Sequence, residues 1–147
     1  MVKYYDIPFE QIGGIKELWE KNRQYHENTS KHFKEIYQFI RFDEKAKSFS
    51  GFPKDKLKIT VAEKDNQYVG YCISTIRGDK GEVESLHVDS ESRRMGIGRE
   101  LMNRHIKWLR EKSSKVIGVT VSQENDSTIS FYKKLGFYPN TLYMQMK

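Results

Sequence analysis

The sequence has 147 residues, of which 37% are apolar and 13% aromatic, and this is enough to build the core of one domain over residues 1–147. Its 26 lysines and arginines exceed its 20 acidic residues, and the resulting net charge of +6 favours an anionic ligand. No apolar run approaches the ~18 residues of a membrane span, and a single cysteine, Cys72, excludes an internal disulfide framework. We therefore expect a cytoplasmic protein.

The first third of the chain predicts a short strand followed by helices. Residues 2–7 alternate weakly, and apolar side chains then recur at helical spacing over about residues 9–26. A second helical pattern covers about residues 33–40, and Asp43 is a candidate start for a third short helix. A loop is expected over residues 48–55, which contain a glycine and a proline.

The middle of the chain changes to the period of a sheet. Three runs rich in β-branched and aromatic residues, 57–62, 68–76 and 83–88, are separated by the turn signals Asp65-Asn66 and Gly78–Gly81. These runs predict an antiparallel meander. Simple alternation in the third run predicts two opposite faces, with Val83, Ser85 and His87 on one and Glu84, Leu86 and Val88 on the other.

The last third predicts a crossover connection and a final strand. A helix follows Gly98, and the nearly all-apolar run 116–121 then has the composition of a buried central strand. Because a helix joins this run to the preceding strand, the two strands should be parallel. A helix over about 125–135 ends at Gly136, and residues 137–146 predict a last strand or hairpin. The predicted fold class is α/β, with a mixed sheet that has an antiparallel front and a parallel back.

Positive charge and glycine gather in one segment, Arg93-Arg94-Met95-Gly96-Ile97-Gly98-Arg99. It joins a predicted strand to a helix N-terminus, where free backbone N–H groups and the helix dipole attract anions. The two glycines allow a ligand to approach the backbone closely. Residues 93–115 contain eight basic and two acidic side chains, so their net charge of +6 equals that of the whole chain. The segment therefore predicts a phosphate site.

Two common nucleotide-binding motifs do not fit this segment. A P-loop ends in Gly-Lys-Ser/Thr, whereas Gly98 is followed by Arg99 and Glu100. A dinucleotide fingerprint needs a third glycine where Leu101 stands, and it needs a parallel unit rather than the end of a meander.

Arg93-x-x-Gly96-x-Gly98, placed after a strand, resembles the acetyl-CoA pyrophosphate loop of the GCN5-related N-acetyltransferases (GNAT). A second segment, from Asn125 to Phe137, is similar to the family's Asn-x-x-Ala…Tyr-x-Lys-Leu-Gly-Phe signature, with Thr128 at the usual alanine. Both signatures stand in the family's order, and the order of elements matches over essentially the whole chain. The resemblance implies a GNAT-like acyl-CoA N-acyltransferase fold with an antiparallel N-terminal meander, parallel central strands and helices on both faces.

The resemblance also implies acetyl-CoA as the acetyl donor, with CoA as product, and a role for individual residues. Residues 93–99 should surround the pyrophosphate, and the strand before them should pair by its backbone with the pantetheine arm, which Asn125 should also contact. The implied cofactor-binding residues are Leu86, His87, Val88, Arg93, Arg94, Met95, Gly96, Ile97, Gly98, Arg99, Asn125 and Tyr132.

Attack of an amine on a thioester needs proton transfer at two places. An alkylamine is mostly ammonium at neutral pH and must lose a proton, while the leaving thiolate accepts one. Tyr132 is the candidate acid, with core packing as the alternative role. Glu84 is the candidate base, and Glu82 or a water chain without a dedicated base are the alternatives.

The remaining titratable and aromatic residues give weaker predictions. His87 is expected on the face opposite Glu84, with a structural role. His26, His32 and His105 have no aspartate or cysteine partner at metal spacing, so no metal is predicted. Trp19, Tyr25 and His26 are candidates for the acceptor pocket, with core contact as the alternative.

The leading functional hypothesis is direct transfer of the acetyl group to a primary amine of a small molecule or peptide, through a ternary complex. A non-catalytic acyl-CoA sensor and a nucleic-acid-binding module stay open, although no nucleic-acid motif is present and neither nucleic acid nor membrane is the expected partner. The acceptor is undetermined among aminoglycosides, polyamines, amino acids, protein N-termini and lysines. An exposed sheet edge and residues 137–147 are candidates for a homodimer contact.

Overall fold

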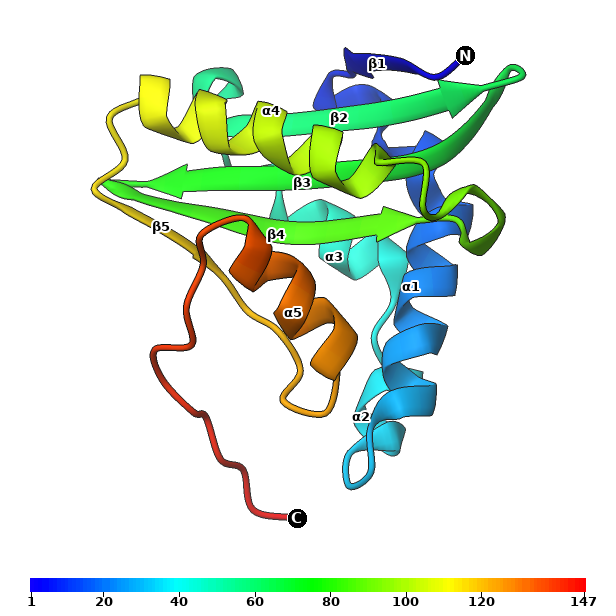
Figure 1. Ribbon diagram of the computed structural model, residues 1–147, viewed down its shortest axis with the longest axis vertical. Coiled ribbons are helices and arrows are strands. Elements are labelled where there is room, and N and C mark those ends of the chain that lie inside the picture. Colours follow the sequence, from blue (N-terminus) through cyan, green and yellow to red (C-terminus); the bar gives the residue numbers. More distant parts are fainter.

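A mixed five-stranded sheet runs through the centre of the molecule, and the computed structural model describes all 147 residues. The strands, in the order β1-β2-β3-β4-β5, are Lys3–Asp6, Leu57–Lys64, Gln67–Arg77, Lys80–Val88 and Val116–Val119. Neighbouring strands from β1 to β4 are antiparallel, whereas β4 and β5 are parallel (Figure 1). The predicted antiparallel meander and parallel crossover are both confirmed.

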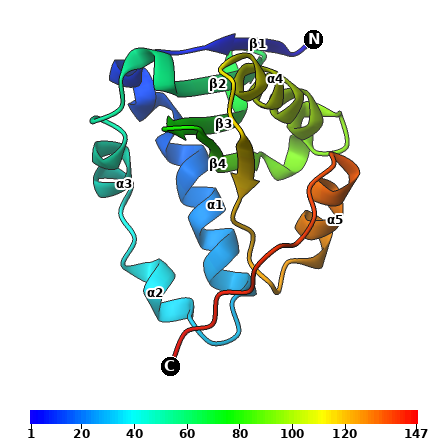
Figure 2. The same ribbon diagram turned by 90° about the vertical axis from the view of Figure 1, so that its left-hand side faces the viewer.

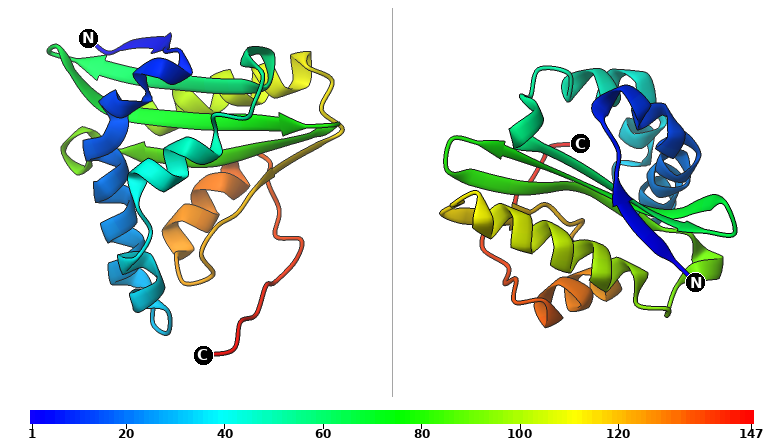
Figure 3. Two further views of the ribbon diagram at one scale, coloured as in Figure 1. Left: turned by 180° about the vertical axis from the view of Figure 1, so that it is seen from behind. Right: turned by 90° about the horizontal axis from the view of Figure 1, so that it is seen from above.

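Helices cover both faces of this sheet, as Figure 3 (right) shows. One face carries a 3₁₀ helix, η1 (Phe9–Ile15), followed by α1 (Lys16–Thr29), α2 (Lys34–Gln38) and α3 (Phe42–Ser48). The other face carries α4 (Ile97–Glu111) and α5 (Asp126–Lys134). The predicted first helix begins as a 3₁₀ helix because it contains Gly13-Gly14, which disfavours the α conformation. None of these helices has the length and apolar character that crossing a membrane requires.

Each face of the sheet has its own apolar core, because successive residues of a strand point to opposite sides. Tyr71 belongs to the core under α1 and α3, together with Ile15 and Phe42, whereas its neighbour Cys72 belongs to the core under α4 and α5. Both Tyr71 and Cys72 have no exposed surface. The two cores fix α1 on one side of β4 and α5 on the other.

A β-bulge interrupts the pairing of β4 with β3. Ile73 stands opposite Ser85, but the next residue of β3, Ser74, stands opposite Val83. Glu84 is therefore the extra residue of the bulge. A bulge shifts the alternation of a strand by one residue, so the side chains before and after it no longer follow one pattern.

This shift corrects the predicted faces of residues 83–88. Val83 packs in the α4 core, where Leu86 and Val88 also lie. Glu84 lies on the α1 face instead, where its Oε2 accepts a hydrogen bond of 2.6 Å from Thr75 Oγ1. Val83 and Glu84 have thus exchanged the faces that simple alternation predicts.

The far edge of the sheet also differs from the prediction. The run 116–121 forms an edge strand that ends at Val119, and its first side chain, Val116, is 54% exposed. No strand forms over residues 137–146, and this segment leaves the sheet (red in Figure 2). Pro139 has no N–H to donate, which disfavours a paired strand at that point. The expected buried central strand is therefore an open edge.

Candidate active site

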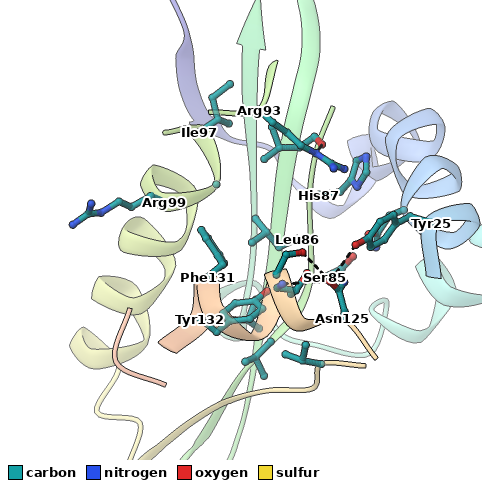
Figure 4. A pocket seen from close by; sticks show the side chains of 18 of the residues that line it. Tyr25, Ser85, Leu86, His87, Arg93, Ile97, Arg99, Asn125, Phe131 and Tyr132 are labelled. Atoms are coloured by element: carbon teal, nitrogen blue, oxygen red, sulfur yellow. Dashed lines mark hydrogen bonds between the residues drawn. The ribbon is translucent and has the colours of Figure 1, made fainter. Parts of the chain in front are cut away.

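A cleft of about 450 Å³ opens where β4 and β5 diverge (Figure 4). The last pair between the two strands is Val83 with Val119, directly before the bulge, and beyond it the strands separate (Figure 1). The cleft is lined by α1, the second half of β4, the start of α4, the residues after β5 and the start of α5. The predicted site residues that line it are Tyr25, His26, Glu84, Leu86, His87, Val88, Arg93, Arg94, Gly96, Ile97, Gly98, Arg99, Asn125 and Tyr132.

Two predicted site residues do not line the cleft. Trp19 is only 6% exposed and packs edge-to-face on Phe42, with ring centroids 5.4 Å apart. This position in the α1 core corrects the expectation that Trp19 lines an acceptor pocket. The side chain of Met95 is half exposed on the loop before α4 and also lies outside the cleft lining.

The bulged half of β4 presents to the cleft backbone groups that pair with no other strand. Asp89 N–H donates to Val69 of β3 at 2.8 Å, and backbone groups of alternate residues point to opposite sides of a strand. The backbone groups of Leu86 and Val88 therefore face the side that β5 has left. This open edge can pair with an extended ligand in the way that an added strand would.

The start of α4 forms an anion site at one end of the cleft. Gly96 precedes the helix with a φ of 78°, a left-handed conformation that favours glycine, and no side chain caps the helix. The N–H groups of Ile97, Gly98 and Arg99 have no acceptor within the protein. Arg93 lies beside them, where its Nε donates to Val88 O at 3.2 Å. Free amides, the helix dipole and the arginines together suit a phosphate or pyrophosphate.

Asn125 joins the two sides of the cleft. It caps α5, with its Oδ1 accepting from Thr128 N at 3.3 Å, and the same oxygen accepts from the Tyr25 hydroxyl of α1 at 3.1 Å (Figure 4). The Arg93 guanidinium in turn lies 5.8 Å from the centre of the Tyr25 ring. Tyr25 therefore connects α5 with the loop before α4, and the Asn125 amide nitrogen keeps two free donors.

Tyr132 enters the cleft from α5. Its ring is 7% exposed and packs edge-to-face with Phe131 and Phe137 at centroid distances of 5.2 and 5.7 Å. Burial raises the pKa of its hydroxyl well above the usual value for tyrosine. No protein group forms a hydrogen bond with this hydroxyl, so its proton is available to a ligand in the cleft.

Glu84 reaches the cleft from the opposite face of the sheet, while its neighbour Glu82 does not. The Glu84 side chain is 10% exposed, holds the hydrogen bond from Thr75 and lies 3.7 Å from the Arg77 guanidinium. Glu82 stands opposite Thr75 on the same face of the sheet but outside the cleft lining, with its carboxylate 3.8 Å from Lys80 Nζ. Burial and then the nearby negative charge of Glu84 raise the pKa of Glu82.

The two histidines of the cleft are neutral at physiological pH. Burial and then the positive charge of Arg93 lower the pKa of His87 to about 4, and burial lowers the pKa of His26. The bulge places His87 on the same face as Glu84, which corrects the expectation of opposite faces. No group of three or more histidine, cysteine or acidic side chains is placed to hold a metal ion.

Several lining residues were not anticipated from the sequence. Asn22 of α1 and Ser85 after the bulge line the α1 side of the cleft, and Phe131 lines the α5 side. No local pattern marks Asn22, because only the tilt of α1 across the sheet brings it to the cleft. Phe131 directly precedes Tyr132 within the second signature, so its position in the sequence could have predicted that it lines the cleft.

Comparison with known proteins places the chain in a family. The model of the Acetyltransferase (GNAT) family matches residues 15–137. An uncharacterised N-acetyltransferase of Methanocaldococcus jannaschii is 31% identical over 91 residues, which are 57% of this chain and 40% of that protein. An N-alpha-acetyltransferase of Sulfurisphaera tokodaii is 33% identical over 90 residues, which are 52% of this chain and 54% of that protein. The matched part thus spans about half the length of these curated relatives.

A solved structure confirms the fold over the whole chain. An aminoglycoside N-acetyltransferase in complex with CoA superposes with a TM-score of 0.73, covering 100% of this chain and 94% of that chain at 15% identity. The antiparallel front, the parallel pair and the helices on both faces are therefore those of the GNAT fold. Because the family model covers most of its length, the chain belongs to the acetyltransferase (GNAT) family, whose members use acetyl-CoA, as its two sequence signatures predicted.

Proposed function

We propose that this chain, as one domain, transfers the acetyl group of acetyl-CoA directly to a primary amine within a ternary complex. The observation that carries the proposal is the divergence of β4 and β5 at the Glu84 bulge, next to the uncapped and basic start of α4. The divergence provides a long cleft that has free backbone donors along one side and an anion site at one end. Acetyl-CoA has the matching shape, and it supplies an acetyl group activated as a thioester.

The fit of acetyl-CoA rests on three parts of the cleft. The amides at the start of α4 and the arginines at positions 93, 94 and 99 would hold its pyrophosphate. The open backbone of Leu86 and Val88 would pair with its pantetheine arm, and the free Asn125 amide would donate to the same arm. A backbone N–H of Leu86 or Val88 would also stabilise negative charge that develops on the reacting carbonyl oxygen.

Two side chains on opposite faces of the sheet would move the protons. Tyr132, which is protonated at neutral pH, would donate to the departing sulfur from the α5 side. Glu84 would accept a proton from the amine on the α1 side, either directly or through a water, while Thr75 holds its carboxylate in place. General acid–base assistance of this kind is worth about 10²–10⁴-fold in rate.

The acceptor is a small-molecule or peptide amine. One relative is an N-alpha-acetyltransferase, and one solved structure of the same fold is an aminoglycoside N-acetyltransferase. These two proteins represent very different acceptors, so neither decides the acceptor of this chain. The tilt of α1 and the residues that it contributes to the cleft, Asn22, Tyr25 and His26, support an acceptor site between α1 and β4.

The test measures binding and turnover in the full chain. Thermal unfolding is followed with acetyl-CoA, with ADP and with a short DNA duplex, and saturation at about 100 times the dissociation constant should add about 2.7 kcal/mol of stability. Release of CoA thiol is then measured with a panel of primary amines. We expect stabilisation by acetyl-CoA and amine-dependent thiol release. Stabilisation without release would instead support an acyl-CoA sensor, and stabilisation by DNA alone would support nucleic-acid binding.

We further propose a homodimer formed at the open edge of β5 and residues 137–147. This segment exposes apolar side chains, among them Tyr138 and Tyr143 at 82% each. A second copy that pairs along the edge would cover both features. Light scattering after gel filtration tests this, because loss of residues 137–147 should turn a dimer into a monomer. A free buried thiol, Cys72, fits the reducing compartment of the proposed cytoplasmic location.

A further inference from the structure

The α4 end and the α1 side of the cleft differ in charge. Three arginines lie at the end formed by the start of α4. The α1 side is lined by Asn22, Tyr25, His26, Ser85 and His87, which are all uncharged, and by one carboxylate. That carboxylate, Glu84, is the only acidic side chain in the whole cleft lining. The Arg93 guanidinium lies against this side, 5.8 Å from the centre of the Tyr25 ring, and adds positive rather than negative charge to it.

Glu84 is itself partly neutralised by its neighbours. Its carboxylate accepts the hydrogen bond from Thr75 at 2.6 Å and lies 3.7 Å from the Arg77 guanidinium. With a side-chain exposure of 10%, it is also removed from most of the solvent. It therefore provides enough negative charge for one ammonium group at most.

The other acidic residues near the α1 side lie outside the cleft lining and have partners of their own. Glu82, which adds no further charge to the cleft lining itself, lies next to Glu84 with its carboxylate 3.8 Å from Lys80 Nζ. Glu20 and Glu27 both bind Arg23, at 3.2 and 2.8 Å. Asp89 binds Lys21 at 3.3 Å, and Glu124 accepts the backbone N–H of Lys31 at 2.7 Å. None of these carboxylates lines the space in which a second or third ammonium group of a bound ligand would lie.

The uncharged wall of the α1 side is aromatic. His26 stacks on Tyr37 with ring centroids 5.9 Å apart and meets Tyr25 edge-to-face at 5.8 Å. Such a wall gains free energy by covering an apolar part of a ligand. It also offers no partner to a buried positive charge beyond the weak attraction of the ring faces.

From this distribution we infer that the acceptor is a monoamine, with a single ammonium group on an uncharged and partly apolar body, as at the N-terminus of a peptide with uncharged first residues. The inference rests on the proposed acetyl transfer at the same site. Placing several ammonium groups on this side of the cleft would leave all but one without a counter-charge, and burial of an unpaired charge is costly. Polyamines and aminoglycosides are therefore poor acceptors.

The first experiment compares acceptors of different charge. CoA thiol release by the full chain is measured with two monoamines and two polycations. The monoamines are 2-phenylethylamine and a tripeptide amide that has a free N-terminus and uncharged side chains, and the polycations are spermidine and kanamycin. We expect kcat/KM for the better monoamine to exceed that for either polycation by about 100-fold, equivalent to about 2.7 kcal/mol. A polycation that reacts as well as the monoamines would overturn the inference and leave the proposed acetyl transfer intact. No release with any amine would refute the acetyl transfer itself, and the inference with it.

A pair of matched variants tests the cause. Asn22→Asp adds a carboxylate on the α1 side, whereas Asn103→Asp adds the same charge on the exposed side of α4, outside the cleft lining. We expect Asn22→Asp to raise the ratio of kcat/KM for spermidine to that for 2-phenylethylamine by about tenfold. Asn103→Asp should leave this ratio unchanged. Equal ratios in the two variants would show that charge in the cleft does not select the acceptor.

Discussion

The Tyr132 phenol has a packing role and a proposed role as an acid, and a single substitution can separate the two. Its ring fills a gap between Phe131 and Phe137, and its hydroxyl forms no bond with the protein. Because burial raises the pKa of this hydroxyl, it keeps its proton throughout the neutral range. The packing role needs only the ring, whereas the proposed acid role needs the hydroxyl.

Tyr132→Phe should therefore preserve the fold and reduce turnover. We expect kcat to fall by about 10²-fold, at the lower end of what general acid catalysis contributes, with the dissociation constant for acetyl-CoA changed by less than about twofold. Stopped-flow thiol release and equilibrium binding measure these quantities separately. If kcat is unchanged from about pH 6 to 9, Tyr132 serves packing alone.

Glu84→Gln removes the proposed base but keeps an oxygen that can accept the hydrogen bond from Thr75. Without a base, the reaction depends on amine that is already deprotonated, and alkylamines have pKa values near about 10. We expect kcat/KM to drop at neutral pH and to recover in part as the pH rises. The control is Glu111→Gln, an exposed side chain of α4 that lies outside the cleft lining. Parallel pH profiles for Glu84→Gln and the unmodified chain would point to a water chain instead.

Among the secondary-structure elements, α1 is connected to both other sides of the cleft through Tyr25. Tyr25 donates to Asn125 at 3.1 Å and lies under the Arg93 guanidinium, so it contacts both walls (Figure 4). Asn125 also caps α5, and a change at Tyr25 should therefore alter the position of two elements. This makes Tyr25 a positioning residue for the proposed acetyl-CoA site.

Tyr25→Phe keeps the ring over which Arg93 lies and removes only the bond to Asn125. A hydrogen bond contributes about 0.5–1.5 kcal/mol net, so we expect KM for acetyl-CoA to rise by about two- to tenfold while kcat changes little. The matched control is Tyr37→Phe, because the Tyr37 ring stacks on His26 but its hydroxyl forms no hydrogen bond. Equal KM values in the two variants would contradict a positioning role for Tyr25.

The elements also show which parts of the site a sequence can predict. The proposed phosphate loop at residues 93–99 and the cap at Asn125 are local, since their residue types directly dictate a turn and a helix start. The bulge at Glu84 is not local, because residues 83–88 alternate as any strand does, and the extra residue exists only relative to β3. Alternation alone therefore assigned Glu84 and His87 to opposite faces.

Over the whole molecule, the sequence-based prediction was wrong where the position of a residue depends on contacts with residues far away in the sequence. Trp19 and Tyr25 lie on the same helix, and only the packing of α1 against β3 and β4 decides which enters the core and which enters the cleft. Residues 137–146 have the composition of a strand, but they leave the sheet although the edge of β5 is unpaired, and apart from Pro139 no local pattern in the sequence marks this. The order of elements, by contrast, follows from hydrophobic period and chain connectivity, and it was predicted correctly up to residue 135.

One buried polar network ties the sheet to α4. His105 has no exposed surface, and its ring nitrogens lie 2.6 Å from Ser74 Oγ and 2.8 Å from Thr60 Oγ1. Thr60 donates onward to Asp6 at 2.6 Å, so the network spans β1, β2 and β3. Burial, followed by the positive charge of Lys58, lowers the pKa of His105 to about 3.

This network makes stability sensitive to acid. Above about pH 6.5, the ordinary pKa of histidine, His105 is neutral in both the folded and the unfolded state. Below it, the unfolded chain binds a proton that the folded chain cannot bind, and the free energy of unfolding falls by up to about 1.4 kcal/mol per pH unit until the folded pKa is reached. His87, with a pKa of about 4, adds in the same direction.

His105→Gln should therefore be less stable than the unmodified chain at neutral pH but should lose stability less steeply on acidification. Urea denaturation at about pH 7, 6 and 5 measures the free energy of unfolding at each pH. We expect its slope against pH to be shallower in the variant by up to about 1.4 kcal/mol per pH unit, which corresponds to one proton. His32→Gln, at an exposed position, should keep the original slope. If His105→Gln and the unmodified chain lose stability in parallel, the proton is taken up elsewhere, with His87 the next group to substitute because its folded pKa is also depressed.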